Sequence, residues 1–324
     1  MKTKPLVSVI VAVSNNEETL YGCIESIIGQ SYANLEIILM VNNSKDCINL
    51  ICHNLTLMDF RIRIVNYSPD NKDNEKLSAF YEGLKHANGN YVAFVDSNDR
   101  LHKDMIRILA RICLKYKCRI ACCKTGTKKD SNTRYLSERG KIRVYKRTPA
   151  FMSRKFTYDL YGKVFDIALF EDLSMSDFYM YPLYYRTEKI SETERKMYFK
   201  DPEIGFNSEI KLCLDTVMKY YKDRIQYFKN SESDLLNLTH EYYCEFLGDY
   251  YIYQLKIKED PKSLENARAE FRKEYGIVRH IKTTPFYTRM RLGLIYYLPK
   301  FYLALIKICR INNKLTMINN LKRL

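Results

Sequence analysis

Polar side chains follow directly after two of the most apolar segments of the sequence. Asn42 and Asn43 follow the run LEIILMV, and the stretch Asp96–Asp99 (DSND) follows the run YVAFV. Carboxylates accept hydrogen bonds from a polar ligand, and an amide carries both a donor and an acceptor. In parallel sheets, ligands bind outside the carboxyl ends of the strands. If both runs are strands of one such sheet, these side chains share one ligand-binding cleft.

Alternating strand and helix patterns indicate which elements position these side chains. Continuous β-branched runs such as VSVIVAV are typical of strands that are buried on both faces, and apolar residues at helical spacing lie between them. The pattern predicts strands over residues 7–13, 35–41, 61–67 and 91–95, and helices over residues 20–28, 47–57 and 77–87. This order predicts an α/β fold with a Rossmann-like, mostly parallel sheet and flanking helices.

The remaining segments are less regular. Residues 120–123 (IACC) are predicted to form a buried strand in which cysteine acts as a small apolar residue, because the spacing of the nearby cysteines fits no common zinc pattern. Residues 124–150 are polar and basic and are predicted to be a long loop. Residues 178–193 are predicted to form a helix that leads to a short strand, and residues 230–276 are strongly helical.

The net charge of +15 is concentrated in two zones. Residues 100–155 contain 18 basic and 3 acidic residues, and residues 275–324 contain 10 basic residues and no acid. Such zones favour polyanionic partners, namely nucleic acid, phosphorylated substrates or an anionic membrane face. Nucleic-acid binding would rest on charge alone, since no recognised module accompanies it, and we do not expect it.

The C-terminal segment combines apolar, aromatic and basic residues. Residues 292–309 are too short and too charged to predict a membrane span. The basic residues that fall on one face of a helix there are Lys300, Lys307, Arg310 and Lys314. A basic, aromatic-bearing amphipathic helix is typical of an interfacial membrane anchor, and the alternative is a helix packed on the protein's own core. With ten cysteines and no secretory leader, we expect a cytoplasmic protein, peripheral on the inner face of the cell membrane.

Four blocks of the N-terminal half follow one another in a characteristic order. They are PLVSVIVAV (residues 5–13), QSYANLEIILMV (30–41), GLKHANGNYVAFVDSND (83–99) and RLHKDM (100–105). Together they resemble the family-2 glycosyltransferases of bacterial polysaccharide synthesis. The resemblance continues more weakly through YGKVFDIALFEDL (161–173) and LPKFYL (298–303). It implies a GT-A fold, a nucleotide-sugar donor, a divalent metal (Mn²⁺ or Mg²⁺) and inversion at the anomeric carbon.

The resemblance also implies where the metal is held. In the family, a D-x-D motif at a strand end binds the cation that neutralises charge on the departing diphosphate. Here Asp96 matches the first acid, Asn98 stands in the position of the second, and Asp99 follows in the turn. We therefore expect the metal ligands among Asp96, Asn98 and Asp99. An Asn can ligate a hard cation through its carbonyl oxygen, but it brings no charge.

Donor binding is expected from the strand ends. The residues that the resemblance implies are Val13, Asn15, Asn42, Asn43, Asp96 and Ser97. The family usually has an acid at the position of Asn42-Asn43 to hold the nucleobase, and an Arg or Asn where Phe80 and Tyr81 occur. These departures leave open a weakened enzyme, an unusual donor or a non-catalytic relative. Basic residues between 100 and 155 would then take over part of the diphosphate neutralisation.

An acceptor hydroxyl needs a carboxylate as general base when it attacks. In the family, this is the Asp of an E-D pair that opens a helix after the block at 161–173. Asp177, in the sequence SDFY, falls where the pair is expected, with Ser in place of Glu. Glu171-Asp172 is the obvious E-D pair, but it lies in the preceding turn. We expect Asp177 to be the base, with Asp172 as the alternative, while an acid at a helix N-terminus is also favoured by the helix dipole alone.

The sequence thus predicts an inverting glycosyltransferase that transfers a sugar from a nucleotide donor, with UDP favoured, to a lipid-linked or cell-surface glycan. The expected domains are residues 1–228 for catalysis, 229–284 for a helical extension and 285–324 for a basic amphipathic tail. The alternative is a catalytically weakened homologue that acts as partner or scaffold of an active glycosyltransferase. A homodimer or a glycosyltransferase partner is left open.

Overall fold

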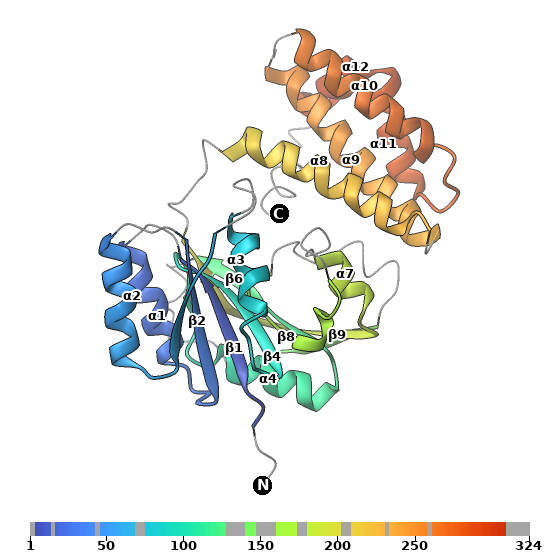
Figure 1. The fold of residues 1–324 in the computed structure, drawn as a ribbon. Helices are drawn as coiled ribbons and strands as arrows, with labels where there is room; N and C mark the ends of the chain where they lie inside the picture. Colours follow the sequence, from blue (N-terminus) through green and yellow to red (C-terminus); the bar gives the residue numbers. More distant parts are fainter. Residues whose placement is uncertain are drawn as a thin grey trace. The chain divides into compact units, whose positions relative to one another are not determined.

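The computed structural model describes residues 4–13, 17–42, 46–68, 75–127, 140–146, 160–173, 180–201, 209–230, 233–257 and 261–308 (Figure 1). The chain divides into two compact units. Among the described residues, the first unit comprises 4–146 and 160–201, and the second comprises 209–308.

Parallel strands form the N-terminal half of the sheet. They are β1 (Val7–Ala12), β2 (Leu35–Val41), β3 (Ile62–Asn66) and β4 (Tyr91–Asp96), in the order β3-β2-β1-β4. Helices α1 (Glu17–Ile28), α2 (Asp46–Met58) and α3 (Glu75–Leu84) alternate with them along the chain. Every residue of β1 is buried, as its continuous apolar run predicts. The predicted βαβ order and parallel pairing are confirmed.

The sheet continues as a mixed half. Strand β4 pairs antiparallel with β8 (Lys163–Asp166), and the order proceeds through β6 (Ile120–Thr127) and β9 (Lys189–Lys200) to β5 (Arg100–Leu101). Strand β7 (Ile142–Lys146) pairs antiparallel with β9. The prediction of a long loop over residues 124–150 was therefore wrong for Lys124–Thr127 and for β7. The β7 side chains are mostly exposed, Ile142 and Val144 among them, so this strand has no buried apolar run that would predict it.

The segment after residue 178 also differs from the prediction. Helix α7 (Met180–Tyr185) is short, and β9 is a long strand of 12 residues rather than a short one. Several charged residues interrupt the apolar pattern expected of a strand, and two of the buried positions of β9 are the polar Ser191 and Thr193. The predicted strand at 120–123 is confirmed, and Cys122 and Cys123 are buried in it.

Close packing fixes α3 against the parallel strands. It contacts both β1 and β2, and a Cβ atom on Gly83 would lie 2.5 Å from Ile10 Cγ2. Glycine is therefore required for this approach of the helix to the sheet. On the rest of the sheet, α4 (Met105–Tyr116) contacts β6, β8 and β9 through buried residues that include Ile106, Leu109 and Cys113.

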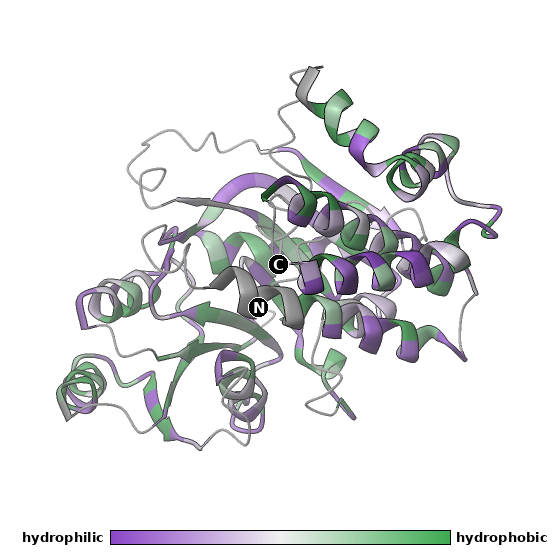
Figure 2. Cartoon of the chain, turned by 90° about the horizontal axis from the view of Figure 1, so that it is seen from above, coloured by the Kyte–Doolittle hydropathy of each residue, from purple (hydrophilic) through white to green (hydrophobic). Residues whose placement is uncertain are grey.

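The second unit is helical. It contains α8 (Glu209–Phe228), α9 (Ser233–Ile257), α10 (Pro261–Val278), α11 (Phe286–Tyr297) and α12 (Pro299–Ile308). Helix α9 packs against each of the other four, and the helices alternate hydrophobic and hydrophilic residues (Figure 2). In contrast to the expected boundary at residue 228, α8 groups with these helices, and α11 and α12 are packed parts of the same unit.

A buried ion pair links α11 to α9. The Arg291 guanidinium contacts the carboxylates of Asp249 and Glu245, and it also donates a hydrogen bond of 3.0 Å to the Tyr302 hydroxyl. None of the helices within the described ranges is both long and apolar enough to cross a membrane. Of the predicted basic face, Lys300 lies in α12, whereas Arg310 and Lys314 fall outside the described residues.

Candidate functional site

The predicted polar turn lies at the carboxyl edge of the parallel sheet. Asp96 is the last residue of β4, and its register partner is Ala12, the last residue of β1. The chain then turns, with Ser97 donating its N–H to the Ala12 carbonyl at 3.2 Å and Asp99 donating its N–H to the Asp96 carbonyl at 2.9 Å. The four side chains from Asp96 to Asp99 are all buried. Burying two carboxylates requires partners for their oxygens.

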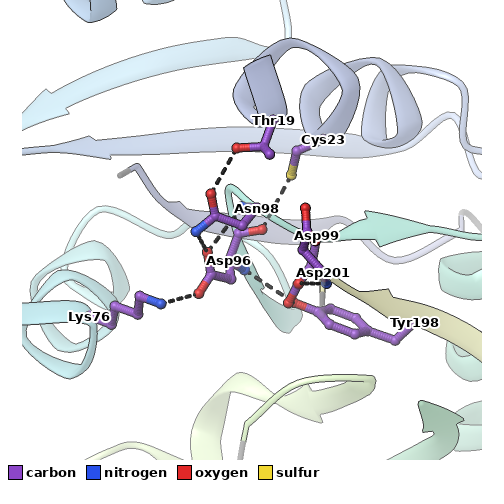
Figure 3. Close-up of polar contacts among 8 residues, drawn as sticks. All are labelled: Thr19, Cys23, Lys76, Asp96, Asn98, Asp99, Tyr198 and Asp201. Carbon is purple, nitrogen blue, oxygen red and sulfur yellow. Dashed lines mark hydrogen bonds and ion pairs between the residues drawn. The ribbon is translucent and has the colours of Figure 1, made fainter. Parts of the chain in front are cut away.

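Asp96 has a partner on each carboxylate oxygen (Figure 3). Its Oδ1 accepts hydrogen bonds from the Asn98 backbone N–H at 3.0 Å and from Asn98 Nδ2 at 2.9 Å. Its Oδ2 forms an ion pair with Lys76 Nζ at 2.5 Å. The Asn98 amide is oriented by a second contact, since Thr19 Oγ1 of α1 donates to Asn98 Oδ1 at 2.7 Å.

Asp99 faces a different element. Its Oδ2 accepts a hydrogen bond from the Tyr198 hydroxyl of β9 at 2.7 Å, and its Oδ1 accepts one from the Asp201 backbone N–H at 3.0 Å. Burial and the charge of Asp96 raise the pKa of Asp99 to about 6, although the Tyr198 hydrogen bond opposes this shift. The Tyr198 hydroxyl in turn accepts from the Asp96 backbone N–H at 3.1 Å. Tyr198 thus bridges the two acids.

These side chains do not form a set of ligands that fits a divalent cation. The oxygens of Asp96, Asn98 and Asp99 already accept the hydrogen bonds given above, and the Asp99 carboxylate is held by β9. Hard divalent cations take several oxygen ligands, and carboxylates supply the charge that holds them. Across the described part of the chain, no group of three or more His, Cys, Asp or Glu side chains is arranged to hold a metal ion.

The second predicted cluster is brought to the same edge by α3. Asn42 follows β2, and its Nδ2 donates to Glu75 Oε1 at 2.7 Å. Tyr67, just after β3, donates from its hydroxyl to the Glu75 carbonyl at 3.1 Å. Glu75 and Lys76 are the first two residues of α3. Consecutive residues of one helix therefore contact the polar ends of β2 and β4.

The other predicted site residues lie near the ends of the described ranges or outside them. Val13 is half-buried and continues β1, donating its N–H to the Met40 carbonyl at 3.1 Å. Asn15, Asn43 and Asp177 lie outside the described residues. Asp172 is exposed in a turn and has a φ of 57°. The carbonyl of Glu171 accepts a hydrogen bond from the Arg186 side chain.

Sequence reasoning missed Lys76, Glu75, Thr19 and Tyr198. The apolar pattern predicts a helix that begins at residue 77, whereas α3 begins at Glu75, so the pattern does not include Glu75 and Lys76. Tyr198 lies 102 residues from Asp96 along the chain, and no local pattern indicates such a contact. The basic residues expected near the diphosphate are partly elsewhere, because Arg107, Arg111 and Lys115 of α4 line a pocket of about 350 Å³ with Arg195.

Comparison with known proteins identifies relatives of the first unit. The family model described as "Glycosyl transferase family 2" matches residues 8–173. The chain is 38% identical over 116 residues to glycosyltransferase GlyA of Streptococcus pneumoniae, covering 36% of this chain and 16% of that protein. It is 32% identical over 108 residues to the putative glycosyltransferase EpsH of Bacillus subtilis, covering 33% of this chain and 30% of that protein. These matches thus span less than a third of either relative.

Solved structures extend the similarity in fold over nearly the whole chain. Staphylococcus aureus TarS 1–349, solved with UDP-GlcNAc, has a TM-score of 0.61 at 16% identity, covering 94% of this chain and 91% of that one. The Pyrobaculum calidifontis mannosyltransferase PcManGT, solved with GDP-Man and Mn²⁺, has a TM-score of 0.54 at 13% identity, covering 99% and 86%. The fold is therefore GT-A-like. Because the family model spans half of the chain, the protein belongs to glycosyl transferase family 2.

Proposed function

We propose that the protein is an inverting glycosyltransferase that transfers a sugar from a nucleoside-diphosphate donor, with UDP favoured, to a lipid-linked or cell-surface glycan. Family membership supports sugar transfer, and the UDP-GlcNAc complex of TarS supports the choice of nucleotide. The observation that carries the proposal is the joined polar cluster at the sheet edge. There Glu75 contacts Asn42, and Lys76 contacts Asp96.

The two halves of this cluster suit the two ends of a nucleoside diphosphate. The Asn42 amide offers a donor and an acceptor, and the Glu75 carboxylate beside it accepts hydrogen bonds. A pyrimidine edge that carries an N–H between two carbonyls is complementary to such a pair. The buried carboxylate of Asp96 accepts hydrogen bonds from hydroxyl groups of the ribose. The ammonium group of Lys76 offers positive charge to the diphosphate.

Sugar transfer requires a base as well as a donor site. The acceptor hydroxyl attacks the anomeric carbon from the face opposite the diphosphate, so a single displacement inverts the configuration. Its proton passes to a carboxylate within about 2.6–3.2 Å, directly or through one water. We assign this role to Asp177, with Asp172 as the alternative.

A lipid-linked acceptor would be met at the cytoplasmic face of the membrane. In the helical unit, Phe286 and Phe301 are 82% and 53% exposed, and the segment after Glu274 has no acidic residue. Exposed aromatic residues with basic neighbours favour the interface of an anionic bilayer. Leu292 and Ile295 of α11 are buried in the unit. Both packing and membrane contact are thus compatible with α11 and α12.

The proposal is tested by measuring release of nucleoside diphosphate from a panel of UDP- and GDP-sugars, with membrane lipid extract as acceptor. Turnover of one donor by the wild type, with loss in Asp96→Ala, is the expected result. A product of retained configuration by NMR would contradict inversion.

The second candidate is a partner or scaffold of an active glycosyltransferase. It is favoured by the neutral Asn98 at a position where the family has an acid. Donor binding without any turnover, together with stimulation of an active transferase by the added protein, would support this second function instead.

A further inference from the structure

We propose that Lys76 takes the place of a metal ion in this site, so that the protein binds its nucleotide donor without a divalent cation. The inference rests on the proposed function, because it concerns the diphosphate of the same donor. It goes further by naming the group that carries the positive charge. The starting observation is that an ammonium group, rather than a cation-binding set of carboxylates, faces the acid at the end of β4 (Figure 3).

Lys76 is placed so that its ammonium group contacts Asp96 and also faces solvent, where a ligand would bind. Its Nζ lies 2.5 Å from Asp96 Oδ2, yet its side chain is 53% exposed whereas that of Asp96 is 8% exposed. An ammonium group has three N–H donors, and a single contact to Asp96 leaves donors for a second anion. The packing of α3 on β1, which requires Gly83, holds the start of the helix over this edge.

The charge of the site matches one ammonium better than one divalent cation. Asn98 is neutral and its amide is held by Thr19 and Asp96, and the Asp99 carboxylate is held by Tyr198 and Asp201. Asp96 is thus the one carboxylate of this turn that faces Lys76. A monovalent cation balances its charge, whereas a divalent ion would have to displace the ammonium group and would lack the further carboxylates that it prefers.

Lys76 can then perform the task that a metal performs elsewhere. In the transfer, the bond from the anomeric carbon to the diphosphate oxygen breaks, and its electron pair stays on that oxygen. A new bond forms from the acceptor oxygen to the anomeric carbon, and the acceptor proton passes to the base. Lys76 donates a charge-assisted hydrogen bond to the departing diphosphate, where the negative charge grows. No oxidant, reductant or further reactant is needed.

The experiment measures binding of UDP and of GDP by isothermal titration calorimetry, with EDTA and separately with Mn²⁺. The variants are Lys76→Met, Lys76→Arg and a control, Lys85→Met. Lys85 directly follows the last residue of the same helix and is exposed, and it pairs with Glu82 instead of the site. Thermal unfolding confirms that each variant is folded. Asn98→Asp is a further variant, because it places a second carboxylate 2.9 Å from Asp96 Oδ1, where the amide nitrogen now donates.

We expect the wild type to bind one of the nucleotides with affinities that agree within about 3-fold in EDTA and in Mn²⁺. Lys76→Met should weaken binding by about 10- to 100-fold, the usual effect of losing a hydrogen bond to a charged group, while Lys76→Arg keeps part of the affinity and Lys85→Met keeps all of it. Nucleotide binding by Asn98→Asp should become tighter when Mn²⁺ is added, since two adjacent carboxylates attract a cation.

Two results would overturn the inference, and they differ in what they leave standing. Binding that requires Mn²⁺ in the wild type and is unchanged in Lys76→Met overturns the role of Lys76 but leaves the proposed function intact. Failure of the folded wild type to bind either nucleotide in both conditions overturns the proposed function together with the inference.

Discussion

The Tyr198 hydroxyl donates a 2.7 Å hydrogen bond to Asp99 Oδ2, and it accepts one of 3.1 Å from the Asp96 backbone N–H. Both hydrogen-bonding directions of the phenol are therefore used inside the fold. Burial raises the pKa of Tyr198 well above its ordinary value, so the hydroxyl retains its proton. Its aromatic ring stacks on Tyr161 with 5.5 Å between the centroids. A single side chain of β9 thus fixes the turn after β4.

Tyr198→Phe tests this bridge. The variant keeps the ring and removes the hydroxyl, leaving a buried carboxylate oxygen and a buried backbone N–H without this partner. We expect the free energy of unfolding to fall by about 1–3 kcal/mol, the range for an unsatisfied buried group. Urea denaturation measures it. Tyr145→Phe is the control, because the Tyr145 hydroxyl contacts the half-buried Glu192 at 3.1 Å. An equal loss in the two variants would argue against the bridge.

The free energy of unfolding should depend on pH through the titration of Asp99. Its pKa is raised from the ordinary 3.8 to about 6 in the folded protein, so between these values the folded state binds the proton and the unfolded state does not. The ionised Asp99 therefore lowers the free energy of unfolding by its full amount above about pH 6. This loss of stability becomes smaller as the pH falls towards 3.8. At 1.36 kcal/mol per pKa unit, the change amounts to about 3 kcal/mol.

Asp99→Asn isolates this effect. The amide does not titrate, so the difference in unfolding free energy between wild type and Asp99→Asn should vary with pH between about 4 and 6. The loss of one acceptor in the variant adds an offset that is independent of pH. Urea titrations at a series of pH values give the difference. A constant difference across this range would show that Asp99 titrates normally.

The assignment of the general base is tested by paired substitutions. Asp177→Asn should keep donor binding and lower kcat by about 10²- to 10⁴-fold, the usual contribution of a general base. Asp172→Asn should change turnover far less and serves as the control. An inactive Asp172→Asn with an active Asp177→Asn would move the base into the E-D pair at 171–172. If both variants keep full activity, neither acid is the base.

Membrane contact is tested by placing charge on the exposed aromatics. Phe286→Asp and Phe301→Asp should reduce flotation of the protein with anionic liposomes, because each loses apolar contact and adds repulsion from the lipid charge. Phe60→Asp is the matched control, since Phe60 is 96% exposed in the sheet unit. Deleting residues 285–324 would be a poorer test, because it removes the buried Leu292 and Ile295. Equal flotation of all variants would contradict membrane contact through these aromatics.

The sequence predicts the parallel half of the sheet well because strands buried on both faces are continuous apolar runs. The full length of strand β9 is not predicted, because its sequence KISETERKMYFK mixes charged residues with buried polar ones. Its burial depends on neighbouring strands. The turn at Asp96–Asp99 is predictable from its place after an apolar run. The partners that orient it, among them Thr19 and Tyr198, are brought in by tertiary packing. Local sequence carries no signal for such contacts.

The adjacency of Glu75 and Lys76 constrains how this site can be redesigned. Successive helical side chains diverge by about 100°, which lets these two reach the ends of β2 and β4 on either side of β1. In the proposed donor site, a shift or rotation of α3 that improved the fit to a different nucleobase would therefore withdraw the ammonium group of Lys76 from Asp96 as well. Changes of base preference should accordingly be sought at Asn42 or by exchanging the Glu75 side chain in place. Moving the helix would trade selectivity against leaving-group stabilisation.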